Sequence, residues 1–285
     1  MKILILCHEQ DRLGGYYIYH LVKAWEDAGH RVETRHGCRS SLPTDVDVAI
    51  LHVDLTVVPE AYTHTLRDYP VVINRNVSNI SKSVISPFLV TEDDPYAGPV
   101  IIKTNNNCFG YREQMLLDKQ NTSGIGMPVS WKTVSSLKRY PVLKSTRVVQ
   151  PGVWENSNMV VEKFLSERDQ EGNFCVRSWT FLGDRERLAL FKAKTPVVKG
   201  SNFIEKIILP SDQVPEELRI TRKRMGFDYG KFDYTMHNGK PVMFDLNKTV
   251  GTGPASTVTP EIMKRAYDMS LGILSFYGKN GTGST

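Results

Sequence analysis

The first 78 residues alternate short apolar runs with a segment of helical periodicity. Lys2–Cys7 is an apolar run of strand length, and in Tyr17–Ala28 the apolar residues recur every three or four positions. Further strand candidates follow at Arg31–Thr34, Val46–Val53 and Val71–Asn74. Because such alternation is typical of a parallel sheet covered by helices, we predict an N-terminal α/β domain over residues 1–78.

The pattern changes after residue 78, where strand-like runs alternate with longer polar loops. Strands are predicted at Pro99–Lys103, Met159–Leu165, Phe174–Leu182 and Leu188–Ala193, and helices at Ser81–Ser86 and near Glu216–Met225. Residues 113–150 are polar and have no strong periodicity, so no element is predicted there. Mixed helices and strands of this kind indicate an α+β arrangement for the remainder of the chain.

A helix is predicted near the C-terminus. Thr259 is a suitable N-cap and Pro260 suits the first turn, after which apolar residues recur on one helical face. The glycine-rich end is predicted to be disordered. The expected organisation is the N-terminal domain 1–78, a central subdomain 79–165, a C-terminal subdomain 166–277 and a disordered tail 278–285.

Two strand-like runs within residues 226–253 flank a hairpin turn and carry acidic residues. The first run holds Asp233, and the second holds Asp245 and Asn247. Side chains alternate along a strand, so Asp245 and Asn247 share a face. Hard oxygen donors suit Mg²⁺, which takes few protein carboxylates together with phosphate oxygens. The segment indicates a magnesium site for a nucleoside triphosphate, the alternative being a solvated hairpin whose polar face holds acids.

The turn decides whether Asp233 joins this face. A strict two-residue turn at Asn238-Gly239 pairs Asp233 with Phe244 and directs Asp245 to the opposite face. A three-residue loop over 237–239 instead places Asp233 diagonally across from Asp245, with Cβ atoms at most roughly 7–8 Å apart. Two metal ions could bridge that gap, so the metal site calls for the three-residue loop.

Composition narrows the class of protein. The 285 residues are 40% apolar and 24% charged, as in ordinary globular proteins. No apolar run reaches the roughly 18 residues needed to span a bilayer, and the start is too short for a signal peptide. The four cysteines are scattered, which favours reduced thiols in the cytoplasm. The formal charge of +5 is spread along the chain, which disfavours nucleic acid and is compatible with a small anionic ligand.

The order of these features resembles the ATP-grasp superfamily, which includes D-alanine–D-alanine ligase and glutathione synthetase. The resemblance covers about residues 71–256. It is carried by Lys82, Ile-Ile-Lys103 with its polar loop, Val-Val-Glu-Lys-Phe-Leu at 160–165, Arg177 and the acidic hairpin. It implies an α/β domain followed by an ATP-grasp core with antiparallel sheets.

The resemblance also implies roles in binding the nucleoside. Glu162 would face the adenine amino group, and backbone groups of Lys163 and Leu165 would line the adenine edge. The ribose contact would come from one of three nearby acids, with Glu171 as our candidate and Glu167 or Asp169 as alternatives.

Further implied roles concern the phosphates and the metal. Lys82 and Lys103 would contact the phosphates of ATP, and Arg177 and Lys231 would lie near the transferred phosphoryl group. The hairpin ligands Asp233, Asp245 and Asn247 would hold two Mg²⁺ ions, with Mn²⁺ as an alternative. The chain departs from the family in having Asp rather than Glu at 245. It also has an asparagine-rich loop after Lys103, and Lys82 stands unusually close to Lys103 in sequence.

The implied activity is an ATP- and Mg²⁺-dependent ligase that joins a small-molecule carboxylate to an amine through an acyl phosphate. A small-molecule kinase and a non-catalytic nucleotide-binding module are the alternatives. Such a ligase needs no nucleophilic side chain, so His8, His52 and His237 are expected to be structural or substrate-contacting. Neither nucleic acid nor a membrane is an expected partner, and a homodimer is left open.

Overall fold

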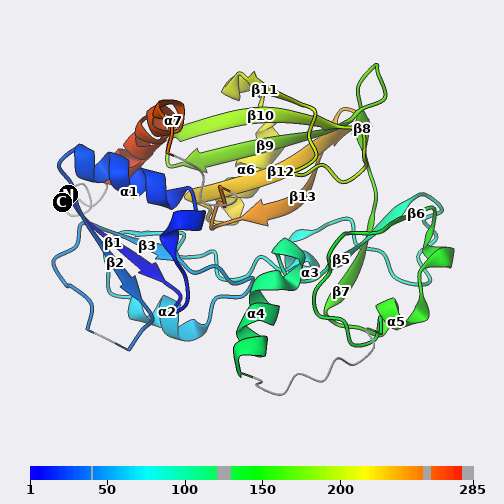
Figure 1. Ribbon diagram of the computed structural model, residues 1–285, viewed down its shortest axis with the longest axis horizontal. Helices are drawn as coiled ribbons and strands as arrows, with labels where there is room; N and C mark the ends of the chain where they lie inside the picture. Colours follow the sequence, from blue (N-terminus) through cyan, green and yellow to red (C-terminus); the bar gives the residue numbers. More distant parts are fainter. Residues whose placement is uncertain (40, 121–129, 253–257, 278–285) are drawn as a thin grey trace, which may run out of the picture.

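A computed structural model describes residues 1–39, 41–120, 130–252 and 258–277, with the backbone alone at 118–120 (Figure 1). The described residues form one parallel and two antiparallel sheets with helices between them. The predicted fold class is confirmed. The predicted disorder of the tail 278–285 lies outside the described residues, and the subdomain boundaries at 78 and 165 stay predictions.

The N-terminal sheet is parallel, in the order β2-β1-β3-β4. Its strands and helices are β1 (Lys2–Cys7), α1 (Ile18–Asp27), β2 (Arg31–His36), β3 (Val48–His52), α2 (Glu60–Thr65) and β4 (Val72–Ile73). Alternate residues of β1 face opposite layers: Ile3 and Ile5 pack toward α1, and Leu4 and Leu6 pack toward α2. The run Ile3–Leu6 of β1 is therefore apolar on both faces, as a central strand covered by two layers requires.

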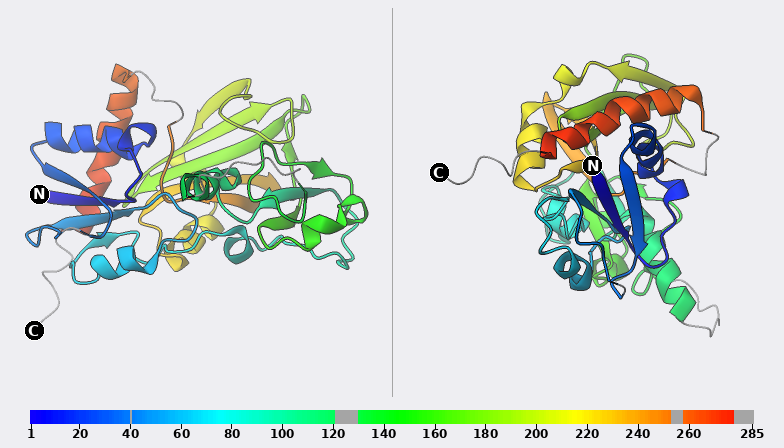
Figure 2. Two further views of the ribbon diagram at one scale, coloured as in Figure 1. Left: turned by 60° about the horizontal axis from the view of Figure 1, so that its bottom comes forward. Right: turned by 90° about the vertical axis from the view of Figure 1, so that its left-hand side faces the viewer.

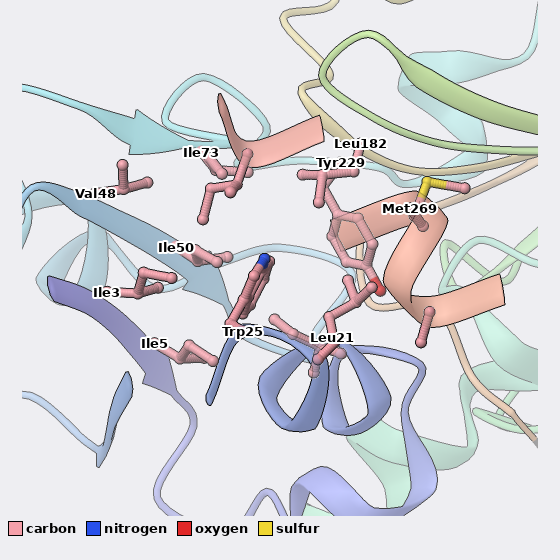
Figure 3. Packing of buried hydrophobic residues seen from close by; sticks show 14 of the residues in the cluster. Ile3, Ile5, Leu21, Trp25, Val48, Ile50, Ile73, Leu182, Tyr229 and Met269 are labelled. Carbon is pink, nitrogen blue, oxygen red and sulfur yellow. The ribbon is translucent and has the colours of Figure 1, made fainter. Parts of the chain in front are cut away.

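The C-terminal helix belongs spatially to this N-terminal layer. Helix α7 (Pro260–Ser270) begins at Thr259, whose side chain accepts a hydrogen bond from Ile262 N at 3.2 Å. Ala266 and Met269 of α7 join the core formed by α1 and β1 (Figure 3). The two helices lie side by side in the views of Figure 2. The chain therefore returns to the N-terminal parallel sheet, and α7 also contacts β9 and β10 of the C-terminal sheet.

The central part is a small antiparallel sheet in the order β6-β5-β7. Its elements are α3 (Lys82–Ile85), β5 (Val100–Thr104), α4 (Tyr111–Gln120), β6 (Val142–Leu143), α5 (Pro151–Trp154) and β7 (Met159–Lys163). Helix α4 and strand β6 lie where the sequence predicts no element. Helix α4 is polar and is held by tertiary contacts, since Arg112 pairs with Asp11 and Glu113 Oε1 accepts from Thr56 Oγ1 at 2.6 Å. Polar contacts of this kind produce no periodic apolar pattern in the sequence, so α4 could not be predicted from periodicity.

The C-terminal sheet is antiparallel, in the order β11-β10-β9-β12-β13 with β8 beside β9. Its elements are β8 (Glu167–Arg168), β9 (Phe174–Leu182), β10 (Arg185–Ala193), β11 (Glu205–Leu209), α6 (Glu216–Arg224), β12 (Tyr229–His237) and β13 (Lys240–Asn247). Short 3-10 segments lie at Leu13–Gly15, Cys108–Gly110, Thr146–Val148, Ser211–Gln213 and Leu271–Phe276. Trp179, Phe181 and Phe232 pack with Leu218 of α6 on one face of this sheet. The other face is left for the site.

The hairpin of β12 and β13 corrects the predicted turn. His237 pairs with Lys240, so the loop is the strict two-residue turn and not the predicted three-residue loop. A β-bulge then shifts the register between Asp233 and Tyr234, so that Asp233 pairs directly with Asp245. A bulge adds one residue to one strand, and beyond it the side chains of that strand alternate again but pair with partners shifted by one residue. The two acids therefore share a face even though the turn has two residues.

The turn gives a stability prediction. Asn238 and Gly239 have φ values of 52° and 75°, as a type I′ turn requires. Gly239→Ala is expected to lower the free energy of unfolding by about 1–2 kcal/mol, since an added Cβ meets nothing within 4 Å and only the left-handed conformation opposes it. Urea unfolding of this variant measures the effect. Gly14→Ala is the control, because Gly14 has the same open surroundings without a positive φ; equal losses in both variants would contradict the turn geometry.

Two further observations bear on the class of protein. No helix of the described residues combines the length and apolar character of a membrane span. All four cysteines, Cys7, Cys38, Cys108 and Cys175, are free thiols.

Candidate active site

A cavity of about 950 Å³ lies between the central sheet and the open face of the C-terminal sheet. Its volume is at the upper end of the range for small-molecule sites. The central side contributes Lys82, Lys103, Glu162, Lys163, Phe164 and Leu165 to its wall. The C-terminal sheet contributes Lys231, Asp233, Asp245 and Asn247. Residues from β5, β7, β12 and β13, far apart in sequence, therefore meet at one cavity.

The hairpin brings its three oxygen donors to the cavity. Asp233 and Asp245 are direct cross-strand partners, and Lys231 pairs with Asn247 in the next same-face row. Lys231 Nζ lies 2.7 Å from Asp233 Oδ2. Burial lowers the pKa of Lys231, but the charge and hydrogen bond of Asp233, together with the charge of Asp245, outweigh burial, so the pKa is raised. Asp233 thus lies beside a lysine that stays protonated at neutral pH.

Lys82 connects Asp245 to the loop that follows β5. At the start of α3, its backbone N–H donates to the carbonyl oxygen of Asn105 at 2.9 Å. Its ammonium group donates to Asp245 Oδ1 at 2.5 Å and to Asn107 Oδ1 at 3.2 Å. Burial would raise the pKa of Asp245, but the nearby lysines, Lys82 first among them, lower it. The carboxylate is therefore ionised and available as a cation ligand.

Asn107 is a site residue that the sequence pattern does not single out. Its Nδ2 donates to Asn247 Oδ1 at 3.0 Å, and its backbone N–H donates to Thr56 Oγ1 at 2.8 Å. It thereby links the third oxygen donor of the hairpin to the N-terminal domain. The only sequence signal is its place in the asparagine-rich loop after Lys103.

Lys103 and Glu162 form a buried ion pair on adjacent strands of the central sheet. Lys103 Nζ lies 2.5 Å from Glu162 Oε2, and the side chains are 5% and 3% exposed. Lys103 Nζ also donates to the carbonyl oxygen of Phe244, the extra residue of the bulge, at 3.1 Å. The other oxygen, Glu162 Oε1, is buried without a hydrogen-bond partner in the described part of the chain. An unpaired buried acceptor in a cavity wall can receive a hydrogen bond from a ligand.

Two of the predicted site residues do not line the cavity. In β9, Val176, Ser178 and Thr180 line it, and Arg177 lies at an intervening position. The guanidinium group of Arg177 pairs with Glu167. Glu171 lies in an exposed turn, where Oε2 accepts from Asn173 Nδ2 at 3.2 Å. Of the three acids considered for the ribose, Glu167 is the one that lines the cavity.

The donor set fits Mg²⁺ bound together with phosphate. Within the described residues, no group of three His, Cys, Asp or Glu side chains could hold a metal ion by itself. The site offers two carboxylates and one amide oxygen on a single face. Mg²⁺ commonly binds through one or two carboxylates and completes its coordination with phosphate oxygens and water. The residues present are therefore suited to a metal–nucleotide complex rather than to a bare ion.

Comparisons with known proteins identify the fold. No protein-family model matches the sequence, and no curated protein matches it. Among solved structures, D-cycloserine synthetase DcsG matches with a TM-score of 0.54 and 10% identity, over 96% of this chain and 99% of that chain. The ATP-grasp ligase PsnB, complexed with a minimal precursor, matches with a TM-score of 0.55 and 12% identity, over 96% and 99%. This chain has the ATP-grasp fold.

A third match agrees with this assignment. D-alanine–D-alanine ligase from Bacillus anthracis has a TM-score of 0.51 and 11% identity, over 97% of this chain and 96% of that chain. The resemblance to the ATP-grasp superfamily, predicted from the lysines, the 160–165 run and the acidic hairpin, is confirmed at the level of the fold. At these identities, residue roles have to be argued from the geometry of the chain itself.

The histidines at predicted strand ends lie outside the cavity wall. His52 is fully buried, and burial lowers its pKa to about 4. His237 Nδ1 lies 3.4 Å from the carbonyl oxygen of Ser166, and His8 stacks against Tyr62. Neither these two nor His52 is among the residues that line the cavity. Their placement leaves lysines and acids as the charged groups at the metal end.

Proposed function

We propose that the chain is an ATP- and Mg²⁺-dependent ligase that joins a small-molecule carboxylate to an amine. The observation that carries the proposal is the convergence of Asp233, Asp245 and Asn247 on one face of a cavity whose other wall holds Lys82 and Lys103. The matched structures include ligases and synthetases, which supports this reaction class.

The nucleoside is proposed to bind along β7 and the segment after it. Glu162 Oε1, the buried acceptor without a partner, suits the adenine amino group, and the backbone of Lys163 and Leu165 suits the adenine edge. For the ribose we propose Glu167 in place of Glu171, because Glu167 faces the cavity. Arg177 is then a positioning residue, since its guanidinium group holds Glu167.

The phosphates and metal are proposed to occupy the charged end. Here each hairpin acid has a lysine partner, Lys82 for Asp245 and Lys231 for Asp233. A metal–nucleotide complex carries both negative and positive charge, as these ion pairs do. Its phosphate oxygens would bind the lysines, and its cation would bind the carboxylates and Asn247. Bound Mg²⁺ would supply charge neutralisation, with Mn²⁺ as a substitute and the number of ions left open.

The chemistry follows from this charge arrangement. A carboxylate oxygen of the substrate attacks the γ-phosphorus of ATP, and the bond to the β,γ-bridging oxygen breaks, giving an acyl phosphate and ADP. The amine then attacks the acyl carbon, loses a proton, and releases inorganic phosphate. Lys82, Lys103 and Lys231 orient the phosphates and neutralise the negative charge spread over the transferred group. No step requires a covalent bond to the protein.

Phosphate release and product mass test the proposal. Mg·ATP is titrated into the protein by calorimetry, and ATP turnover is then screened against pools of carboxylates with and without amines. We expect phosphate release that needs both co-substrates, and a product whose mass is the sum of the two minus water. A phosphorylated product without amine dependence would indicate a kinase. Absence of Mg·ATP binding would overturn the proposal, and it would exclude the kinase as well as the ligase.

The setting of this reaction is also a proposal. The four free thiols are compatible with a reducing compartment, and we retain a cytoplasmic location on that basis. The small-molecule partners are those of the proposed ligase reaction.

A further inference from the structure

The cavity extends beyond the metal ligands to a second charged end. Arg187 of β10, Lys206 of β11 and Arg265 of α7 line this part, which we call the distal cations. Figure 1 shows α7 beside the end of the C-terminal sheet that is nearest α1, away from β5 and β7. Arg187, near the start of β10, and Arg265 of α7 therefore lie at the end of the cavity away from the proposed adenine site. Lys206 stands farther along the sheet, where it pairs with Phe191 of β10.

The distal cations differ from the cavity lysines in having no buried acid beside them. Among the described residues, neither Arg187 nor Lys206 forms an ion pair, while Arg265 pairs with the exposed Glu261 one turn earlier. By contrast, the three lysines of the metal end each have a carboxylate partner.

The distal cations are close enough to repel one another. Burial and then the charge of Arg265 lower the pKa of Arg187. Burial, Arg187 and Arg265 lower the pKa of Lys206. Like charges held together in a partly buried site disfavour the folded state unless an anion binds among them. Such repulsion is the kind of local conflict expected at a binding site.

Neighbouring polar groups complete the distal end. The hydroxyl of Tyr17 donates to the carbonyl oxygen of Arg265 at 3.0 Å and so ties α7 to the start of α1. His20 is 2% exposed, lines the cavity, and has Nδ1 buried without a hydrogen-bond partner in the described part of the chain. The end thus offers an unpaired imidazole nitrogen in addition to the cations.

Strand register gives the span between the two ends. Arg187 pairs with Thr180 of β9, and Thr180 pairs with Lys231 of β12, whose partner on β13 is Asn247. Arg187 therefore stands in one cross-strand row with Lys231, two strands away. Adjacent strands are about 4.8 Å apart, so the two positions are about 10 Å apart on the sheet face.

We propose that the distal cations bind a second anionic group of the acid substrate, a carboxylate or a phosphate. The substrate class is then a small acid with a second anion about 10 Å from the carboxylate that is activated beside the metal ligands. Guanidinium groups bind carboxylate and phosphate in bidentate geometry, which suits Arg187 and Arg265 for this role. This inference rests on the proposed ligase function.

Binding of defined probes tests the inference. Linear dicarboxylates from succinate to suberate are titrated by calorimetry into the full chain, with and without a Mg·ATP analogue that cannot transfer phosphate. Monocarboxylates of the same lengths are the ligand controls. We expect the longer dicarboxylates to bind at least 10-fold more tightly than their monocarboxylate counterparts. Titration of 6-phosphonohexanoate in the same way shows whether the distal cations bind a phosphate-like group more tightly than a second carboxylate.

Variants locate the binding. Arg187→Gln is expected to weaken dicarboxylate binding at least 10-fold, leave the affinity for the Mg·ATP analogue unchanged, and leave the melting temperature unchanged or higher because like-charge repulsion is removed. Arg265→Gln provides a second test on another element. Arg185→Gln is the matched control, because Arg185 lies on the same strand outside the cavity wall and pairs with Asp184. It is expected to bind as the unmodified chain does.

The outcomes separate this inference from the ligase proposal. Equal affinity for mono- and dicarboxylates, or equal losses in Arg187→Gln and Arg185→Gln, would overturn the distal anion site even if Mg·ATP binds. Failure of the Mg·ATP analogue to bind would overturn the ligase proposal. Dicarboxylate selectivity that depends on Arg187 but persists without nucleotide would support the anion site alone.

Discussion

Asp245→Asn is expected to lower ATP turnover by about 10²–10³-fold, measured as phosphate release under saturating substrates. The change keeps the shape of the side chain but removes the charge that holds Lys82 at 2.5 Å and that would bind the cation. Losing one preorganised electrostatic contact to a developing charge commonly has an effect of this size. A parallel Mg²⁺ titration should show a weaker dependence on the metal.

Controls distinguish catalysis from folding in this experiment. Removing Asp245 leaves Lys82 with a 2% exposed side chain and no counter-charge, so thermal melts must accompany the rate measurements. Asp245→Glu retains the charge and is expected to keep most of the activity. Asp184→Asn removes an exposed acid from the β9–β10 turn and should leave turnover unchanged. Near-normal turnover by folded Asp245→Asn protein would rule out the metal role.

The hairpin shows what a sequence can and cannot predict about such a site. Alternation along β13 correctly places Asp245 and Asn247 on one face, because that relation is local. The relation to Asp233 is not local, since it depends on a bulge at Phe244 whose carbonyl oxygen is bound by Lys103 from another sheet. The Asn238-Gly239 dipeptide alone predicts the correct two-residue turn. It then assigns Asp233 to the wrong face, because the bulge shifts the pairing by one residue.

Face assignments across strands have the same limit. Arg177 lies within an apolar strand and Arg187 directly before the predicted strand Leu188–Ala193, and their sequence surroundings give no means of telling which one faces the cavity. The structure places Arg187 in the row of Thr180 and Lys231, and Arg177 at an intervening position beside Glu167. One step of strand phase moves a side chain to the other face. Motif order therefore predicted the fold, but it could not predict which face of a strand a single arginine occupies, and the roles of the side chains stay predictions.

Lys103→Met is expected to lower the free energy of unfolding by about 3–5 kcal/mol, measured by urea unfolding. The substitution leaves Glu162 as a buried carboxylate without its partner, and breaking a buried ion pair from one side carries a penalty of this order. Lys163→Met is the matched control on β7, at the residue that follows Glu162. Lys163 is half-buried with its ammonium group over the Tyr96 ring, so the control should lose about 1 kcal/mol or less.

The double variant Lys103→Met with Glu162→Gln separates the structural role of the pair from its role in binding. It removes both charges, so most of the lost stability should return, because a neutral replacement of a buried pair is often close to neutral in energy. The affinity of the double variant for Mg·ATP should be at least 10-fold weaker than that of the unmodified chain, because the proposed phosphate ligand Lys103 and the proposed adenine acceptor Glu162 are both removed. If the double variant bound Mg·ATP as tightly as the unmodified chain, the Lys103–Glu162 pair would be a packing feature of the central sheet, and the nucleotide would have to bind elsewhere in the cavity.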